Sequence, residues 1–126
     1  MKIDVSPGEV VDRITILEIK LERLTDLAQR RRVETEYASI CDTHNASLGA
    51  CEQVAALRAK LKEVNTSLWR IEDLLREHEG RNDFGREFVE LARSVYLHND
   101  RRSALKRQIN ECLGSAVTEE KSYTSY

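Results

Sequence analysis

The chain has 126 residues, of which 33% are charged and 6% aromatic, with one proline and five glycines, a profile typical of a single all-α domain built from long helices with charged surfaces. Its formal net charge of −2 argues against nucleic-acid binding, and no run approaches the roughly twenty apolar residues that a membrane span needs. Three cysteines and the lack of a recognisable amino-terminal signal predict a reduced, cytoplasmic, bacterial-type protein.

A helix start follows a short amino-terminal arm, residues 1–5, which we expect to be extended. Ser6 is a good N-cap, Pro7 suits the first helical position, and Glu9 follows Ser6 by three residues, which completes a capping box. The next apolar residues repeat at steps of three and four, and they predict a broad-faced amphipathic helix: Val10, Ile14, Leu17, Leu21 and Leu24.

The apolar pattern changes phase by about two residues after Leu24, a shift that does not continue a coiled-coil repeat. We therefore expect a kink or short loop near residues 29–32 and a separate, shorter helix over 33–47. A cluster of Asn, Ser and Gly over 45–49 predicts its end.

The most regular apolar row lies in the central part of the chain and predicts a helix over residues 50–79 that stops at Gly80. Its members are Val54, Leu57, Leu61, Val64, Leu68, Ile71 and Leu75. A last helix is predicted from Phe84 to Cys112, with Asp83 as N-cap and Gly114 as its end. The short connection predicts that these two helices are antiparallel neighbours.

Together these elements predict an all-α fold: an antiparallel helical bundle with coiled-coil-like heptad packing, made of three long helices and one shorter segment. Residues 1–126 form one predicted helical domain, in which 115–126 are a polar carboxy-terminal tail.

Polar and aromatic side chains flank the predicted seams of the central and last helices, and a hairpin turning near residue 81 brings them together at mid-bundle. The candidate ligand-binding residues are Asn65, Trp69, Glu72, Asp73, Arg93, Tyr96, Asn99 and Asp100. One interpretation is a structural network that sets helix register, with Arg93 paired to Glu72 or Asp73. The other is a pocket in which Arg93 binds a carboxylate or phosphate.

Other candidate sites have weaker patterns. Cys41, His44 and Cys51 lack a second CxxC pair, so we predict neither a metal nor a cofactor. A general base would have to come from Glu72, Asp73, His98 or Asp100, among which the sequence does not choose. The tail contains four candidate docking residues, which are Glu119, Glu120, Lys121 and Tyr123.

Five stretches carry a family resemblance: VSPGEVVDRITILEIKLERL, VNTSLWRIED, FVELARSVYLHNDRR, KRQIN and GSAVTEEKSY. With them the chain resembles a family of short bacterial proteins grouped as a domain of unknown function. The resemblance implies a shared helical fold and no particular reaction. It also implies that the polar residues of these stretches belong to a common pattern, namely Asp12, Lys20, Asn65, Trp69, Glu72, Asp73, Arg93, Tyr96, Asn99, Asp100 and the EEKSY tail.

Two functions remain open at this level. The first is a helical interaction or oligomerisation module, because three heptad-like stripes are more than one small monomer comfortably buries. Its partner would be a second copy or another helical protein. The second is a small-anion-binding or catalytic bundle that uses the polar cluster between the central and last helices.

Overall fold

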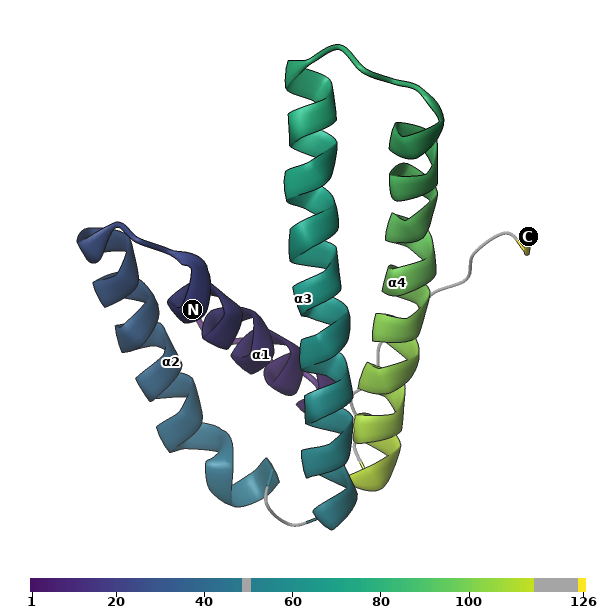
Figure 1. Ribbon diagram of the computed structural model, residues 1–126. Helices are drawn as coiled ribbons and strands as arrows, with labels where there is room; N and C mark the ends of the chain where they lie inside the picture. Colours follow the sequence, from purple (N-terminus) through teal and green to yellow (C-terminus); the bar gives the residue numbers. More distant parts are fainter. Residues whose placement is uncertain (49–50, 115–124) are drawn as a thin grey trace.

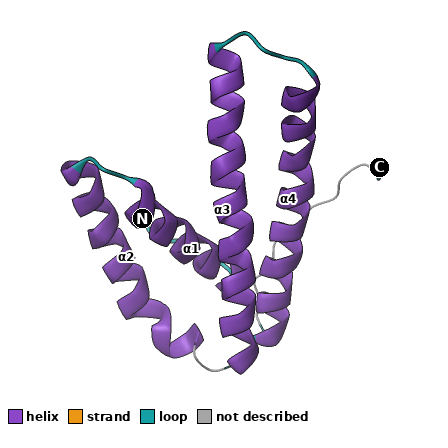
Figure 2. Ribbon diagram, in the orientation of Figure 1, coloured by secondary structure: helices purple, strands orange, loops and turns teal. Residues whose placement is uncertain are grey.

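The computed structural model describes residues 1–48, 51–114 and 125–126. It contains four helices, α1 (Pro7–Arg23), α2 (Leu27–Leu48), α3 (Glu52–Gly80) and α4 (Arg86–Cys112), and no strand within the described residues (Figure 2). The all-α prediction is therefore confirmed. None of these helices has the length and apolar character needed to cross a membrane.

The helices form two hairpins that meet at one end of the molecule (Figure 1). α3 and α4 lie side by side, and α1 crosses the half of this pair that contains the start of α3 and the end of α4. α2 packs against α1, on the side away from α4. The other half of the α3–α4 hairpin projects beyond α1, so the bundle has a three-helix base and a two-helix extension.

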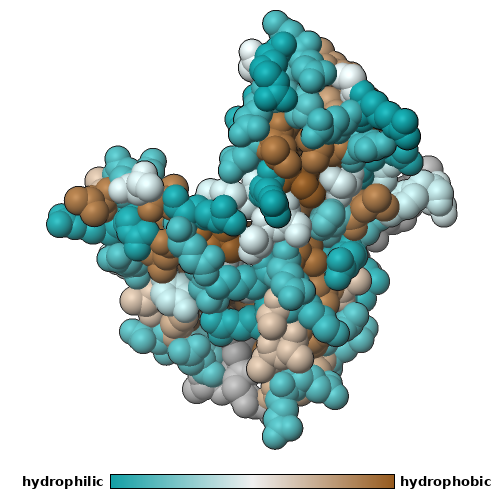
Figure 3. All heavy atoms as spheres, viewed as in Figure 1, coloured by the Kyte–Doolittle hydropathy of each residue, from teal (hydrophilic) through white to brown (hydrophobic). Residues whose placement is uncertain are grey.

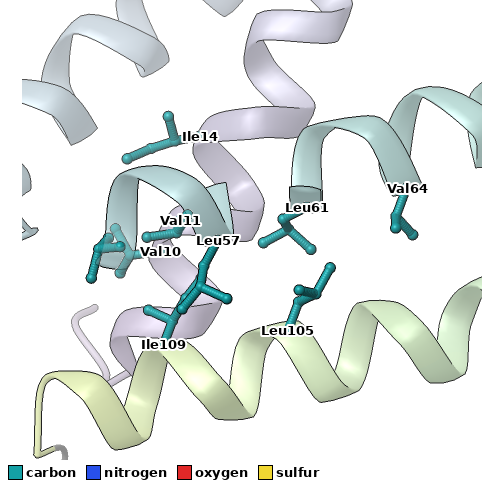
Figure 4. Close-up of a cluster of buried hydrophobic side chains, with 9 residues drawn as sticks. Val10, Val11, Ile14, Leu57, Leu61, Val64, Leu105 and Ile109 are labelled. Atoms are coloured by element: carbon teal, nitrogen blue, oxygen red, sulfur yellow. The ribbon is translucent and has the colours of Figure 1, made fainter. Parts of the chain in front are cut away.

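The base is held together by apolar residues from α1, α3 and α4 (Figure 4). Nine of them form a continuous buried cluster, which comprises Val10, Val11, Ile14, Val54, Leu57, Leu61, Val64, Leu105 and Ile109. Apart from Val11, which follows Val10 directly, these residues recur at steps of three and four, which place them on one face of each helix. The first four residues of the predicted α3 seam, Val54, Leu57, Leu61 and Val64, are buried, and beyond them Ile71 is the one seam residue that is buried.

The amino-terminal cap forms as predicted, but the capping box does not close. The Oγ of Ser6 accepts a hydrogen bond from the backbone N–H of Glu9 at 3.3 Å. The carboxylate of Glu9 turns away from Ser6 and pairs with Lys106 on α4, with 2.6 Å between Oε2 and Nζ. A tertiary ion pair has therefore replaced the second half of the local motif.

The break after the first helix lies earlier than residues 29–32, so that prediction was wrong. Leu24 is extended and ends α1, and Asp26 starts the next helix by accepting a hydrogen bond from the N–H of Gln29 at 3.0 Å. Arg30, inside α2, donates to the carbonyl of Leu24 at 3.0 Å. As a result α2 has 22 residues and α1 only 17, so the first helix is the short one.

The α3–α4 turn is built by residues 81–85. Asn82 adopts a positive φ of 52°, a conformation that asparagine tolerates well. The ring of His78 is buried, and its Nδ1 lies 3.2 Å from the carbonyl oxygen of Asp83, which fixes the start of the turn. Asp83 caps the turn at Gly85 and not the helix, so α4 begins at Arg86, two residues later than predicted.

Candidate functional site

A buried polar network joins α1, α3 and α4 at the edge of the apolar cluster. Asp12 is 1% exposed and receives two hydrogen bonds from Arg102, from Nε to Oδ1 at 2.8 Å and from Nη2 to Oδ2 at 2.6 Å. The Nδ2 of Asn65 donates to Asp12 Oδ1 and to Thr15 Oγ1, each at 2.9 Å. The hydroxyl of Thr15 in turn donates to the carbonyl of Asp12 at 2.7 Å. Both carboxylate oxygens of Asp12 are therefore satisfied by protein groups.

This arrangement fixes the register of three helices. A two-pronged contact between a guanidinium and a carboxylate has a narrow geometry, so sliding α1 along α4 would leave a buried charge unpaired. Asn65 adds a second restraint because it bonds to two residues one turn apart on α1. Of the eight candidate ligand-binding residues only Asn65 belongs to this network, in which the arginine is Arg102 and the carboxylate is that of Asp12.

More ion pairs continue along α1 on both sides of this network. Glu18 accepts from Arg58 at 2.9 Å, and Glu22 accepts from Lys62 at 2.6 Å. The hydrogen bond from Lys62 to Glu22 raises the pKa of the lysine. With the Glu9–Lys106 pair, α1 presents a row of acidic residues to basic residues of α3 and α4.

The amino-terminal end of α1 approaches α4 very closely at Gly8. Its N–H donates to Oδ1 of the buried Asn110 at 2.7 Å. A Cβ at this position would lie 2.4 Å from the backbone oxygen of Lys106, which leaves no room for any side chain. Gly8 therefore allows the helix contact that brings Glu9 and Asp12 to their partners.

The candidate residues on α3 are separated in the structure. Asn65 lies in the buried network, whereas Trp69 is half-buried further along α3. Glu72 and Asp73 are exposed, and Glu72 pairs with Arg76 of its own helix at 3.9 Å. The interpretation that pairs Arg93 with Glu72 or Asp73 does not match the structure, in which Arg93 bonds to Tyr96 and Glu72 pairs with Arg76.

On α4 the candidate residues form a small exposed group. Arg93 donates from Nε to the hydroxyl of Tyr96 at 3.4 Å, and this hydrogen bond raises the pKa of Arg93. The ring of Tyr96 packs edge-on against that of Tyr126, with 5.4 Å between centroids. The hydroxyl of Tyr126 donates to Asp100, which raises the pKa of the tyrosine. Asn99 is partly exposed beside this group.

The four predicted tail residues, Glu119, Glu120, Lys121 and Tyr123, lie outside the described residues, and their docking stays a prediction. Tyr126 does contact α4, as described above.

A shallow groove runs between α3 and α4 next to the polar network, with a volume of about 610 Å³. Its lining includes Lys62, Thr66, Ser67, His98 and Arg101, together with Ala59, Glu63 and Val64. His98 is held by a bond of 2.8 Å from Nδ1 to the carbonyl oxygen of Ser94, which assigns a proton to Nδ1 and leaves Nε2 for a ligand. The sequence indicated His98 only as one possible general base and gave no sign that it lies near Arg101.

No three His, Cys, Asp or Glu side chains gather closely enough to hold a metal in the part of the chain that the structure describes. The weak candidate set of Cys41, His44 and Cys51 therefore forms no such group there.

Comparison with known proteins gives one result. A model described as a family of unknown function (DUF6165) matches residues 1–126. No curated protein and no solved structure matches significantly. The match covers the polar residues of the network and of the groove together with the whole helical framework, and the chain belongs to this family of unknown function, DUF6165.

Proposed function

We propose that this protein is a helical interaction module that self-associates through the outer hairpin, the part of α3 and α4 formed by residues 66–104. The observation that carries the proposal is the low burial of this segment. Only Ile71 and His78 are buried in it, although it contains more than half of α3 and of α4. α1 packs against α3 up to Asn65, and beyond this residue α3 has α4 as its one neighbour among the described helices (Figure 1).

Two helices packed only against each other are a poor source of stability, because each buries one narrow stripe and exposes the rest. The outer hairpin exposes large apolar side chains among the described residues, including Phe84 and Val89 at 49% and Leu97 at 46%. Apolar residues also gather at the surface of the projecting part of the molecule (Figure 3). Val89 and Leu97 are eight residues apart on α4 and so share one face.

A second copy of the chain is the partner that fits this surface best. Two outer hairpins of equal length can pair into a four-helix bundle, the common solution for exposed apolar stripes on helical hairpins. Charges of both signs border the stripe, as in the pairs Arg86–Glu90 at 3.1 Å and Arg76–Glu72 at 3.9 Å. A surface of mixed charge suits a two-fold interface, in which the same patch faces itself.

Leu97→Glu and Val89→Glu test the proposed interface. We expect the natural chain to sediment as a dimer at micromolar concentration, and each substitution to weaken dimerisation by about 100-fold, because it buries an unpaired carboxylate in the interface. Sedimentation velocity over a dilution series measures the dissociation constant. Both side chains are half-exposed in the single chain, so its helical content should not change.

Leu27→Glu is the matched control. Leu27 is 72% exposed at the start of α2, outside the outer hairpin, and its substitution should leave the dimer intact. A natural chain that stays monomeric at high micromolar concentration would contradict the proposal. Equal weakening by the control would also contradict it, since the effect would then not depend on the outer hairpin.

We further propose a cytoplasmic location for this module. Support comes from the three cysteines, all of which are free thiols. Such thiols are typical of a reducing compartment.

The groove between α3 and α4 favours a second candidate function, the binding of a small anion such as inorganic phosphate or a carboxylate. Lys62 is already neutralised by Glu18 and Glu22. Arg101, however, is exposed and makes no ion pair with the described residues. Its charge, the hydroxyls of Thr66 and Ser67, and Nε2 of His98 are the groups that would bind the anion.

Arg101→Met should weaken phosphate binding at this groove by at least about tenfold, because a charged hydrogen bond contributes about 1.5–3 kcal/mol. The chemical shifts of amide groups around Ser67 and His98, followed during titration with inorganic phosphate, give the affinity. Arg107→Met, which removes an exposed arginine of α4 outside the groove, should have no effect. Glu63→Gln should strengthen binding, since it removes a carboxylate from the lining. Absence of saturable shifts at millimolar phosphate would exclude this function.

A further inference from the structure

Two of the three free cysteines lie in direct contact. The sulfur atoms of Cys51 and Cys112 are 3.2 Å apart, although the residues are separated by 61 positions in the sequence. Cys51 is the residue before α3, and Cys112 is the last residue of α4. The contact therefore lies at the base of the α3–α4 hairpin, at the end opposite the turn of residues 81–85 (Figure 1).

We propose that Cys51 and Cys112 form an oxidisable dithiol site that reacts with low-molecular-weight disulfides of the glutathione type and closes into an intrachain disulfide. The bond requires the two sulfurs to approach to about 2.05 Å. Both residues lie at helix ends, where small backbone adjustments do not break the interior hydrogen bonds of a helix. Cys41 packs against the same apolar cluster but is half-buried among other residues and has no sulfur partner among the described residues.

The environment of the pair assigns a role to each sulfur. A hydrogen bond with Cys112 lowers the pKa of the Cys51 thiol, and the same contact raises the pKa of Cys112. While both thiols are protonated, Cys51 donates to Cys112, and the Cys112 S–H donates to Oε1 of Gln53. Once Cys51 is ionised, the Cys112 S–H can turn from Gln53 to donate to the thiolate. Cys51 lies at the N-terminal end of α3, where the helix favours a thiolate, whereas Cys112 lies at the C-terminal end of α4. Cys51 is therefore the thiolate that attacks first, and Cys112 is the thiol that resolves the intermediate.

The reaction balances without any further reagent. The Cys51 thiolate attacks one sulfur of the small disulfide, forms a mixed disulfide and releases the first small thiolate. The Cys112 thiolate then attacks the sulfur of Cys51, the intrachain bond forms, and the second small thiolate leaves. Two protein thiols lose two electrons and two protons, and the small disulfide is reduced to two thiols that take up the protons.

A small disulfide can reach this pair from the surface, because Cys51 and Cys112 are both partly exposed. Cys112 lines an open hollow of about 530 Å³ between α3 and α4, together with Gln53, Lys60 and Gln108. Its sulfur also lies 2.9 Å from Oε1 of Gln53. Lys60 and Glu111 both line this hollow, so it offers charges of both signs to a reagent such as oxidised glutathione, which carries amine and carboxylate groups.

Oxidation of a Cys41→Ser variant with oxidised glutathione tests the proposal, because this variant retains only the proposed pair. We expect the intact mass to fall by two hydrogens, and peptide mapping should find Cys51 joined to Cys112. The bond closes a long loop, so the oxidised chain should unfold at a higher temperature than the reduced chain, with a Tm shift on the order of 10 °C.

Cys51→Ser and Cys112→Ser, each in the Cys41→Ser background, are the controls. Each should stop at a mixed disulfide with glutathione or remain reduced, with no intrachain bond. In the reduced Cys41→Ser chain, alkylation should modify Cys51 at a lower pH than Cys112, because its thiol ionises first. Mixed disulfides without an intrachain bond in Cys41→Ser, or a Tm that falls on oxidation, would overturn the proposal. Circular dichroism of each variant verifies that it folds.

Discussion

Asp12→Asn is expected to lower the free energy of unfolding by about 3 kcal/mol, which raises the unfolding equilibrium constant more than about 100-fold. The substitution removes the charge that two hydrogen bonds from Arg102 satisfy inside the protein. The new amide also has one acceptor oxygen, whereas the carboxylate accepts hydrogen bonds from Arg102 through both of its oxygens and from Asn65 through Oδ1. The expected loss lies at the lower end of the range for removing one partner of a buried ion pair. The reason is that the Arg102 side chain is 30% exposed and can bind water. Urea unfolding followed by circular dichroism measures the change.

Glu36→Gln provides a control of the same chemistry at the surface. Its carboxylate pairs with Arg13, and the two side chains are 37% and 61% exposed. An exposed pair contributes little, so we expect a change below about 0.5 kcal/mol. If Asp12→Asn had an equally small effect, Asp12 would not be the structural centre of the base.

Gly8→Ala is expected to destabilise the protein by about 3 kcal/mol, although alanine favours helices over glycine by roughly 0.8–1 kcal/mol. The new Cβ would lie 2.4 Å from the backbone oxygen of Lys106, and a backbone group cannot rotate away as a side chain can. α1 and α4 would have to separate. That movement lengthens the bond of 2.7 Å from Gly8 to Asn110 and the ion pair of 2.6 Å between Glu9 and Lys106.

Gly80→Ala is the matched control for this prediction. Gly80 is the last residue of α3, and a Cβ there meets no atom within 4 Å. Helix propensity then acts alone, and we expect a stabilisation of about 0.5 kcal/mol. The two substitutions are chemically identical and should change stability in opposite directions in the same denaturant experiment. A neutral or stabilising Gly8→Ala would show that the contact between α1 and α4 is looser than the structure indicates.

The stability of the fold and the proposed self-association depend on different parts of the molecule, the base and the outer hairpin. Asp12 and Gly8 act at the base, where α1 closes the core, whereas Val89 and Leu97 lie on the outer hairpin. The proposed disulfide also lies at the base. Substitutions at the base should therefore change unfolding with little direct effect on dimerisation, and substitutions on the outer hairpin should do the reverse.

Much of the fold was predictable because the signals that carry it are local. Ser6 caps α1 within three residues of itself, and the steps of three and four define the buried face of each helix without reference to a partner. Gly114, with a φ of 59°, lies just past the end of α4 as predicted. The break between α1 and α2 was misplaced because the change of apolar phase shows that a break exists but not the residue at which it falls. Only the folded chain brings the guanidinium of Arg30 back to the carbonyl of Leu24.

The candidate site required the tertiary structure. Arg93 and Arg102 are both arginines on α4, and their spacing does not show which one meets a buried carboxylate. That choice depends on where α1 crosses the hairpin, and the close approach at Gly8 and the partners of Asp12 fix the crossing point. By itself the sequence determined the helices and their apolar faces, since these depend on neighbours a few residues apart. The tertiary structure decided the Asp12–Arg102 network and the contact between Cys51 and Cys112, since both join residues far apart in the chain that only the packing of one helix on another brings together.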